Sequence, residues 1–144
     1  MIRIIFPALA CTLVACAGLT LADSPVAVRD TTLGPVLTDS DGMTLYLFTR
    51  DEPGVSNCYD GCAAAWPPYM AEEGAAATDR LSLVPRDDGG QQWAYDDMPL
   101  YYWVNDQQPG DVTGQGVNDV WFVIEVSEGE AVRSRSERSR SSGY

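Results

Sequence analysis

Two aspartates hold matching places in the chain and could form a paired carboxylate site. Asp51 and Asp106 each end a short aromatic-rich segment, and they lie 55 residues apart. Two carboxylates brought together can share a proton or surround a cation. An aspartate after a strand more commonly accepts hydrogen bonds from the amides of the next turn or from a tyrosine hydroxyl. The sequence therefore favours a structural role, with the paired site as the alternative.

Two cysteines, Cys58 and Cys62, form the second candidate group. An exported domain with two cysteines usually joins them in a disulfide, and so small a loop gives a modest entropic gain of about 2 kcal/mol. The alternative is a reactive dithiol, or a Cu(I) site completed by methionines such as Met43, Met70 or Met98. We predict a structural disulfide in which Cys58 precedes a helix, because this spacing within a helix gives awkward bridge geometry.

Other reaction types are limited by composition, because the chain contains neither histidine nor lysine. The absence of histidine removes His-based triads, acid–base chemistry near neutral pH and the commonest zinc ligand. The absence of lysine removes Schiff-base chemistry. The sequence therefore favours a non-enzymatic protein, and we assign no catalytic residue, metal ligand or cofactor. A hydrolase limited to carboxylate chemistry is the third alternative.

The domain is strongly acidic. The segment from Asp23 to Glu130 contains four arginines against twenty acidic residues, which gives a formal charge near −16. Such a surface repels phosphate backbones, so we predict no nucleic-acid binding by the folded part. The partner classes that remain are an envelope component or a small ligand.

An internal repeat must position these residues, because the segment from Leu45 to Asp51 returns as the segment from Leu100 to Asp106. Two similar supersecondary units therefore build one domain. Alternate residues of a strand face the same side, so the two rings of each copy share a face. A tryptophan follows each repeat aspartate by fifteen residues, and we predict that these two are equivalent core positions. The recurring residues are Tyr46, Phe48, Asp51 and Trp66 in the first copy, and Tyr101, Trp103, Asp106 and Trp121 in the second.

The two copies fit a Tyr-x-(Phe/Trp/Tyr)-x-x-Asp pattern, and the block at 57–68 reads Asn-Cys-Tyr-Asp-Gly-Cys-Ala-Ala-Ala-Trp-Pro-Pro. With the Pro-Gly-Asp at 109–111 and the Gly-Gln-Gly-Val at 114–117, the chain resembles the bacterial lipoprotein family known as the secreted repeat of unknown function. The resemblance covers roughly 34–126. It implies an exported domain without an established activity.

The fold that we predict is mainly β, a single small domain of two pseudo-equivalent β-hairpin repeats in a sheet or sandwich arrangement. One short helix follows Cys58, and Pro67 ends it within two turns. Turns rich in Asp and Gly predict the hairpins, and the apolar run at 120–126 predicts a central last strand. The segments that we expect to pair are 36–38 with 43–48, and 81–84 with 92–95, followed by a strand at 100–104.

The chain divides into a leader at 1–22, a domain at 23–127 and a tail at 128–144. Within the domain, repeat 1 covers about 34–70 and repeat 2 about 91–126. The leader has the charge and short apolar run of a signal peptide. The tail alternates Ser and Arg, cannot bury apolar area and is expected to be disordered.

Two processing sites fit the leader. Cys16 ends a Leu-Val-Ala-Cys segment similar to a lipobox and would carry a lipid, whereas Ala22 ends a small-residue site that would release the domain. A lipid on Cys16 is the only membrane attachment that we predict. We expect an exported protein of the periplasm or cell envelope that acts as a non-enzymatic binding or structural module. The alternative is a redox or soft-metal protein that uses Cys58 and Cys62.

Overall fold

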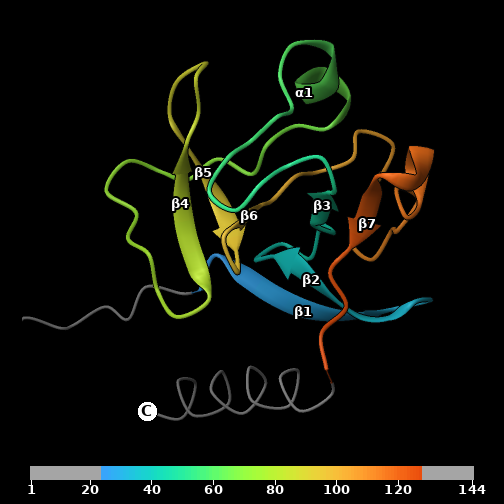
Figure 1. The fold of residues 1–144 in the computed structure, drawn as a ribbon. Helices are drawn as coiled ribbons and strands as arrows, with labels where there is room; N and C mark the ends of the chain where they lie inside the picture. The colour runs from blue at the N-terminus through green and yellow to red at the C-terminus, as the bar shows by residue number, and fades with distance from the viewer. Residues whose placement is uncertain (1–23, 128–144) are drawn as a thin grey trace, which may run out of the picture.

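A computed structural model describes residues 24–127, and it is mainly β with one short α-helix, as predicted (Figure 1). The predicted signal peptide, the lipidation candidate Cys16 and the Arg/Ser tail lie outside the described residues. Within 24–127, no helix has the length and apolar content needed to cross a membrane. The elements in chain order are β1 (Val26–Thr31), β2 (Gly34–Asp39), β3 (Tyr46–Phe48), α1 (Gly61–Ala65), β4 (Leu81–Pro85), β5 (Gln91–Tyr95), β6 (Met98–Pro99), the 3₁₀ turn η1 (Val117–Asp119) and β7 (Trp121–Val123).

The two repeats meet at a pair of tyrosines in the middle of the domain. The backbone N–H of Tyr46 donates to the carbonyl of Tyr101 at 2.8 Å, and the N–H of Tyr101 donates back at 3.0 Å. On its other side Tyr46 pairs with Val123, and Tyr101 pairs with Pro68. These pairings are equivalent under a shift of 55 residues, so a pseudo-two-fold axis passes between the two tyrosines.

Each repeat gives its last extended segment to the other repeat. β3 of the first repeat pairs with β7 of the second. The N–H of Leu37 donates to the carbonyl of Ile124 at 2.9 Å, and in the other half the N–H of Trp93 donates to the carbonyl of Tyr69 at 2.8 Å. The repeats are therefore interlocked, and neither completes its own sheet.

The hairpins match the prediction in the second repeat and differ in the first. β4 and β5 pair antiparallel across the Asp- and Gly-rich turn, as expected. In the first repeat the main hairpin is instead β1 with β2, and only short pairing follows the turn at 39–42. The sequence prediction missed β1 as a partner because its turn lacks an Asp-Gly pair. That turn is closed by Thr31, whose Oγ1 donates to the carbonyl of Gly34 at 2.8 Å.

The apolar run at 120–126 does not form the single long strand that we expected. β7 covers only three of its residues, because the chain changes partner from β3 to β2 after Val123. The N–H of Val126 then donates to the carbonyl of Pro35 at 2.9 Å. The predicted strand at 100–104 does not form, and only isolated bridges of Tyr101 with Tyr46 and with Pro68 are present there.

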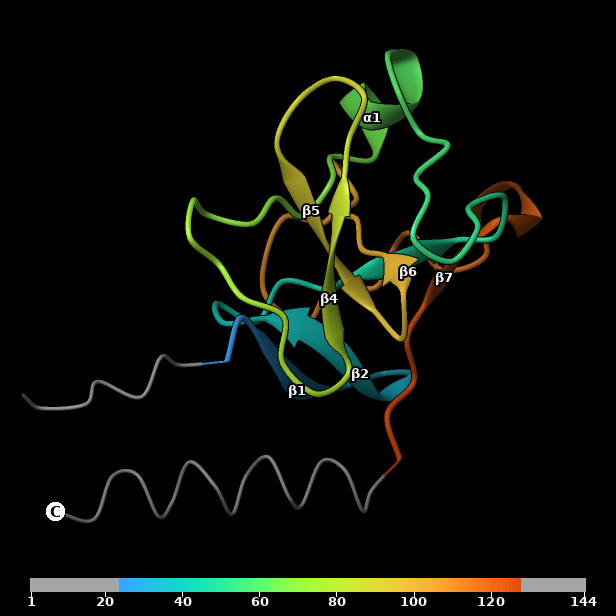
Figure 2. The same cartoon turned by 60° about the vertical axis from the view of Figure 1, so that its left-hand side comes forward.

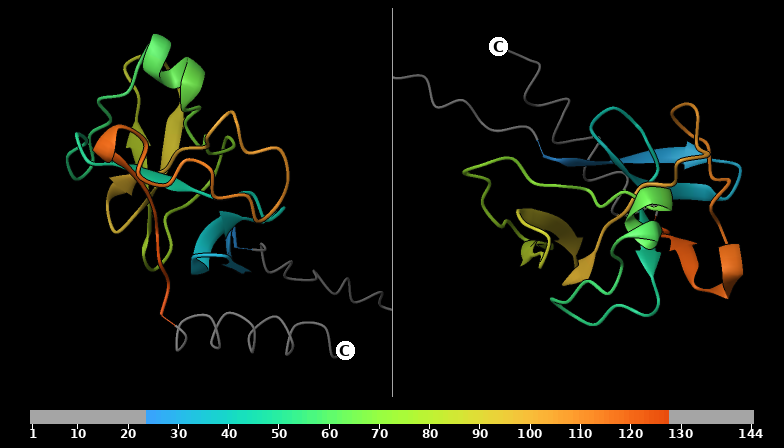
Figure 3. Two further views of the ribbon diagram at one scale, coloured as in Figure 1. Left: turned by 90° about the vertical axis from the view of Figure 1, so that its right-hand side faces the viewer. Right: turned by 90° about the horizontal axis from the view of Figure 1, so that it is seen from above.

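Two hydrophobic clusters form the core, and alternation along β3 separates them. Tyr46 and Phe48 belong to an aromatic cluster with Trp66 and Trp121, whereas Leu47 between them packs against a second, mainly aliphatic cluster. Such alternation is the usual consequence of strand geometry. Two views agree that α1 lies at the opposite end of the domain from β1 and β2 (Figures 1 and 2). A further view shows η1 beside β7 (Figure 3).

Candidate functional site

The motif tyrosines and aspartates contact each other across the repeats. The hydroxyl of Tyr46 donates to Oδ2 of Asp106 at 2.7 Å, and the hydroxyl of Tyr101 donates to Oδ2 of Asp51 at 2.7 Å. All four side chains are buried. The motif thus joins the two halves of the domain, because its tyrosine and aspartate bond between the repeats and not within one repeat.

The second oxygen of each aspartate holds the turn that follows it. Oδ1 of Asp51 accepts the N–H of Asn57 at 2.7 Å. Oδ1 of Asp106 accepts the N–H of Thr113 at 3.0 Å and its hydroxyl at 2.6 Å. Every oxygen of the two carboxylates therefore accepts a hydrogen bond from a protein donor. Among residues 24–127 no group of three or more His, Cys, Asp or Glu side chains is placed to hold a metal ion.

Burial and hydrogen bonds shift the pKa values of Asp51, Tyr46 and Tyr101. Burial raises the pKa of Asp51, and the hydrogen bonds from Tyr101 and from the N–H of Asn57 oppose that rise. Burial also raises the pKa of Tyr46 and of Tyr101 far above the ordinary tyrosine value, and the hydrogen bond to a carboxylate adds to the rise. Both tyrosines are therefore protonated donors at neutral pH.

Four aromatic rings form a continuous stack beside the tyrosine pair. Trp66 and Trp121 lie at its centre, with ring centroids 3.9 Å apart and planes only 3° from parallel. Phe48 stacks on the outer face of Trp121 at 4.3 Å, and Trp103 stacks on the outer face of Trp66 at 4.1 Å. The stack alternates between the repeats, and each end ring covers the tryptophan of the other copy.

The motif tyrosines pack edge-on against the central rings. Tyr46 meets Trp66 with centroids 5.3 Å apart, and Tyr101 meets Trp121 at 5.2 Å. Such T-shaped pairs are a favoured aromatic geometry. The structure thus places the two tryptophans, at 4 % and 3 % exposure, in equivalent core environments.

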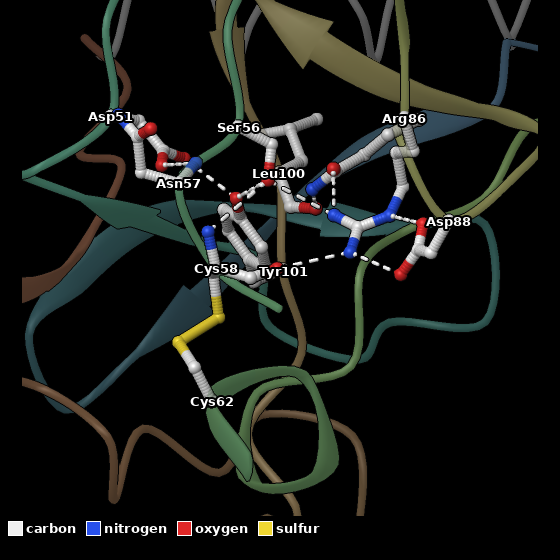
Figure 4. The surroundings of a disulfide bond; sticks show 10 residues. Asp51, Ser56, Asn57, Cys58, Cys62, Arg86, Asp88, Leu100 and Tyr101 are labelled. Carbon is white, nitrogen blue, oxygen red and sulfur yellow. Dashed lines mark hydrogen bonds and ion pairs between the residues drawn. A yellow bond between two sulfur atoms is a disulfide. The ribbon is translucent and has the colours of Figure 1, made fainter. Parts of the chain in front are cut away.

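The predicted disulfide is present between Cys58 and Cys62, whose Cα atoms lie 5.3 Å apart. Cys58 precedes α1 and is fully buried, and Figure 4 shows the bridge with the buried polar groups beside it. The disulfide fixes the start of α1 against the core.

A buried arginine, Arg86, was missed by sequence reasoning. It comes from the tip of the β4–β5 hairpin, and its guanidinium donates to the carbonyl of Cys58 at 2.9 Å and to Oγ of Ser56 at 3.0 Å (Figure 4). It also donates to both oxygens of Asp88 at 2.8 Å. Burial lowers the pKa of Arg86, but the hydrogen bond to Asp88 and the negative charge of Asp88 together raise it by more, so the guanidinium stays charged.

Arg86 begins a chain of hydrogen bonds that ends at a motif aspartate. Oγ of Ser56 lies 2.7 Å from the hydroxyl of Tyr101. Because that hydroxyl gives its proton to Asp51, Ser56 acts as the donor to Tyr101. The only sequence sign of this arrangement was the rarity of arginine, since the acidic domain has four. The first repeat has no such arginine, and there the N–H of Gly114 donates to the hydroxyl of Tyr46 at 3.1 Å.

Comparison with known proteins agrees with the repeat geometry. A family model described as a secreted repeat of unknown function matches residues 27–70 and again residues 82–125. The two matched segments are offset by 55 residues, the same shift that relates Tyr46 to Tyr101. No curated protein matches the chain, and no solved structure matches it.

Proposed function

The chain belongs to the family of secreted repeats of unknown function, and from that premise we propose that it is a non-enzymatic binding or structural module outside the cytoplasm. The observation that carries this proposal is the exchange of hydrogen bonds between Tyr46 and Asp106 and between Tyr101 and Asp51. The tyrosines and aspartates of the repeat motif hold the two halves of the domain together through these bonds. They build a rigid frame, and the surface of this frame is where a ligand or partner would bind.

The location and partner follow from export. The mature protein resides in the periplasm or cell envelope, and its partner is an envelope component or a small ligand. It is either a lipoprotein attached through Cys16 or a domain released after Ala22. The intact mass of protein purified from its own envelope separates these two, because a diacylglyceryl group on Cys16 adds a mass that cleavage after Ala22 cannot.

The second candidate is a redox or soft-metal protein that uses Cys58 and Cys62. The surroundings of the bridge favour a structural disulfide instead, because Cys58 is fully buried and its carbonyl accepts from Arg86. Reactive cysteines are usually accessible to their reaction partners, whereas Cys58 has no exposed surface. A bridge held in this way resists exchange with an external thiol.

Thiol labelling tests the choice directly. Mature protein, denatured without reductant, should label at neither Cys58 nor Cys62, and the folded protein should resist dithiothreitol at concentrations that reduce it after unfolding. A Cu(I) titration against a chromogenic chelator should show no uptake by the folded protein. Labelling of both cysteines, or Cu(I) uptake lost in Cys58→Ser, would reject the structural role and establish the second candidate.

A further inference from the structure

An open depression of about 560 Å³ lies beside the aromatic stack. Its size is in the range of small-molecule sites. Phe48, Trp66 and Trp121 are among the residues that line it. The polar groups at its rim are Arg50, Asn57 and Asn118, all of them exposed. An apolar lining with a few polar groups is the usual composition of a ligand pocket.

Neither central tryptophan offers an open ring face to a ligand in this depression. Both faces of each indole are covered within the stack, so only the ring edges remain available. Within residues 24–127 no acceptor is bonded to the indole N–H of Trp66 or Trp121, and no fully buried side-chain donor in this part of the chain lacks a partner. Neither indole nitrogen is therefore completely buried, although both side chains are almost wholly covered. Ring edges and indole N–H groups are electropositive and attract anions.

The cation at the rim has no carboxylate to neutralise it. Arg80 pairs with Asp96, and Arg86 pairs with Asp88. Arg50, in contrast, makes no side-chain hydrogen bond or ion pair within residues 24–127. Asn105 stands at the equivalent place in the second repeat. The first repeat thus carries a positive charge at a position where the second repeat carries a neutral side chain, so the two halves of the domain differ here.

We propose that this depression binds a small organic carboxylate with a flat apolar body. The guanidinium of Arg50 matches a planar carboxylate through two parallel hydrogen bonds. The indole N–H groups of Trp66 and Trp121 face the same anion, and the apolar lining beside Phe48 contacts the body of the ligand. A stacked sugar ring does not fit this site, because no indole face is open. The inference deepens the binding function proposed above by naming the class of ligand.

The test uses benzoate as the probe, benzamide as its uncharged isostere and glucuronate as a carboxylate on a hydroxylated ring. NMR titration of the full mature protein at constant ionic strength should show saturable binding of benzoate. Its affinity should exceed that of benzamide and of glucuronate at least tenfold. The indole N–H signals of Trp66 and Trp121 should shift, while that of Trp93, which lies in the other core cluster, should stay in place.

Two arginine variants complete the experiment. Arg50→Gln should weaken benzoate binding at least tenfold, to the level of benzamide. Arg29→Gln is the matched control, because it removes the same charge from an exposed arginine that lines a different part of the surface, and it should bind benzoate as the wild type does. Equal affinity for benzoate and benzamide, equal weakening by both variants or unshifted indole signals would overturn the carboxylate site. Glucuronate binding tighter than benzoate would overturn the apolar ligand class. Neither result would affect the frame of Tyr–Asp bonds, which stability measurements test separately.

Discussion

The hydroxyl of Tyr46 donates to the carboxylate of Asp106, a residue 60 positions further along the chain, and not to Asp51 of its own repeat. In the sequence, each tyrosine and aspartate of the motif lie close together within one repeat. In the structure, the tyrosine of each repeat bonds to the aspartate of the other repeat. Because each bond crosses the pseudo-two-fold axis, the two bonds together oppose separation of the halves.

A double-mutant cycle should detect this exchange. Tyr46→Phe leaves a buried carboxylate oxygen without its donor and should cost about 1.5–3 kcal/mol of unfolding free energy. Combined with Asp106→Asn, it should show a coupling of about 0.5–3 kcal/mol. Combined with Asp51→Asn, it should be additive within about 0.5 kcal/mol. Urea denaturation of the variants gives these values. A larger coupling for the pair within one repeat would contradict the structure.

Alkaline pH should destabilise the domain through its buried tyrosines. Burial and the hydrogen bonds to the aspartates raise the folded-state pKa of Tyr46 and Tyr101 well above the unfolded value near 10. Above pH 10 the unfolded chain loses protons that the folded chain keeps. The contribution of the two tyrosines to the free energy of unfolding is therefore fully present below pH 10 and is lost as pH rises above it. Urea denaturation between pH 8 and pH 11 should show a smaller loss in Tyr46→Phe or Tyr101→Phe than in the wild type. Parallel loss in all three proteins would show that these groups are not protected.

The packing around the stack can be probed with two glycines. A Cβ on Gly114 would lie 2.8 Å from ring atoms of both Trp66 and Tyr46, and neither ring can move without disturbing the stack. Gly114→Ala should therefore cost about 1–3 kcal/mol. Gly61→Ala is the control, because Gly61 opens α1 and its Cβ would meet nothing within 4 Å. That control should stabilise the protein by up to about 1 kcal/mol. Thermal melts measure both, and an equal effect of the two changes would refute the close contact.

The two central tryptophans should respond alike. Trp66→Ala and Trp121→Ala each remove a buried ring from the middle of the stack and should each cost about 3–5 kcal/mol. Trp103 ends the stack and is only partly buried, so Trp103→Ala should cost less. Urea denaturation ranks the three variants. A loss under 1 kcal/mol at Trp66 or Trp121, with benzoate binding impaired instead, would indicate a surface role for that ring.

Calcium should not stabilise the domain through its motif carboxylates. Each oxygen of Asp51 and Asp106 already accepts a hydrogen bond from the protein. Melting temperatures with calcium and with a chelator should therefore agree at matched ionic strength. A site filled at a hundred times its dissociation constant would add about 2.7 kcal/mol. A calcium-dependent rise that disappears in both Asp51→Asn and Asp106→Asn would establish the paired cation site that the sequence left as the alternative.

Features with a local cause could be predicted from the sequence. The β4–β5 hairpin follows from the turn before Gly90, and the disulfide follows from two cysteines in an exported domain. Identical spacing in the two copies also indicated that Trp66 and Trp121 occupy equivalent positions. In each case the evidence lies within a few residues or in the comparison of the two copies.

Features that depend on distant contacts could not be predicted. The spacing from Tyr46 to Asp51 equals that from Tyr101 to Asp106, so sequence alone cannot decide whether the bonds close within a repeat or across the axis. Arg86 reaches Cys58 only because a hairpin tip folds back over the start of α1. The exchange of last strands leaves no local sign either, since the apolar run at 120–126 suits several partners.

The exchange of last strands makes the domain comparable to a dimer whose two subunits share one polypeptide. The tether is the mostly exposed connector at 71–80, which keeps the halves at a high effective concentration. A protease that cuts only this connector should leave two fragments that remain together and coelute, held by the interlocked strands. A chain with a single repeat could complete its sheets only by associating with a second copy, so its folding, unlike that of this chain, would depend on concentration.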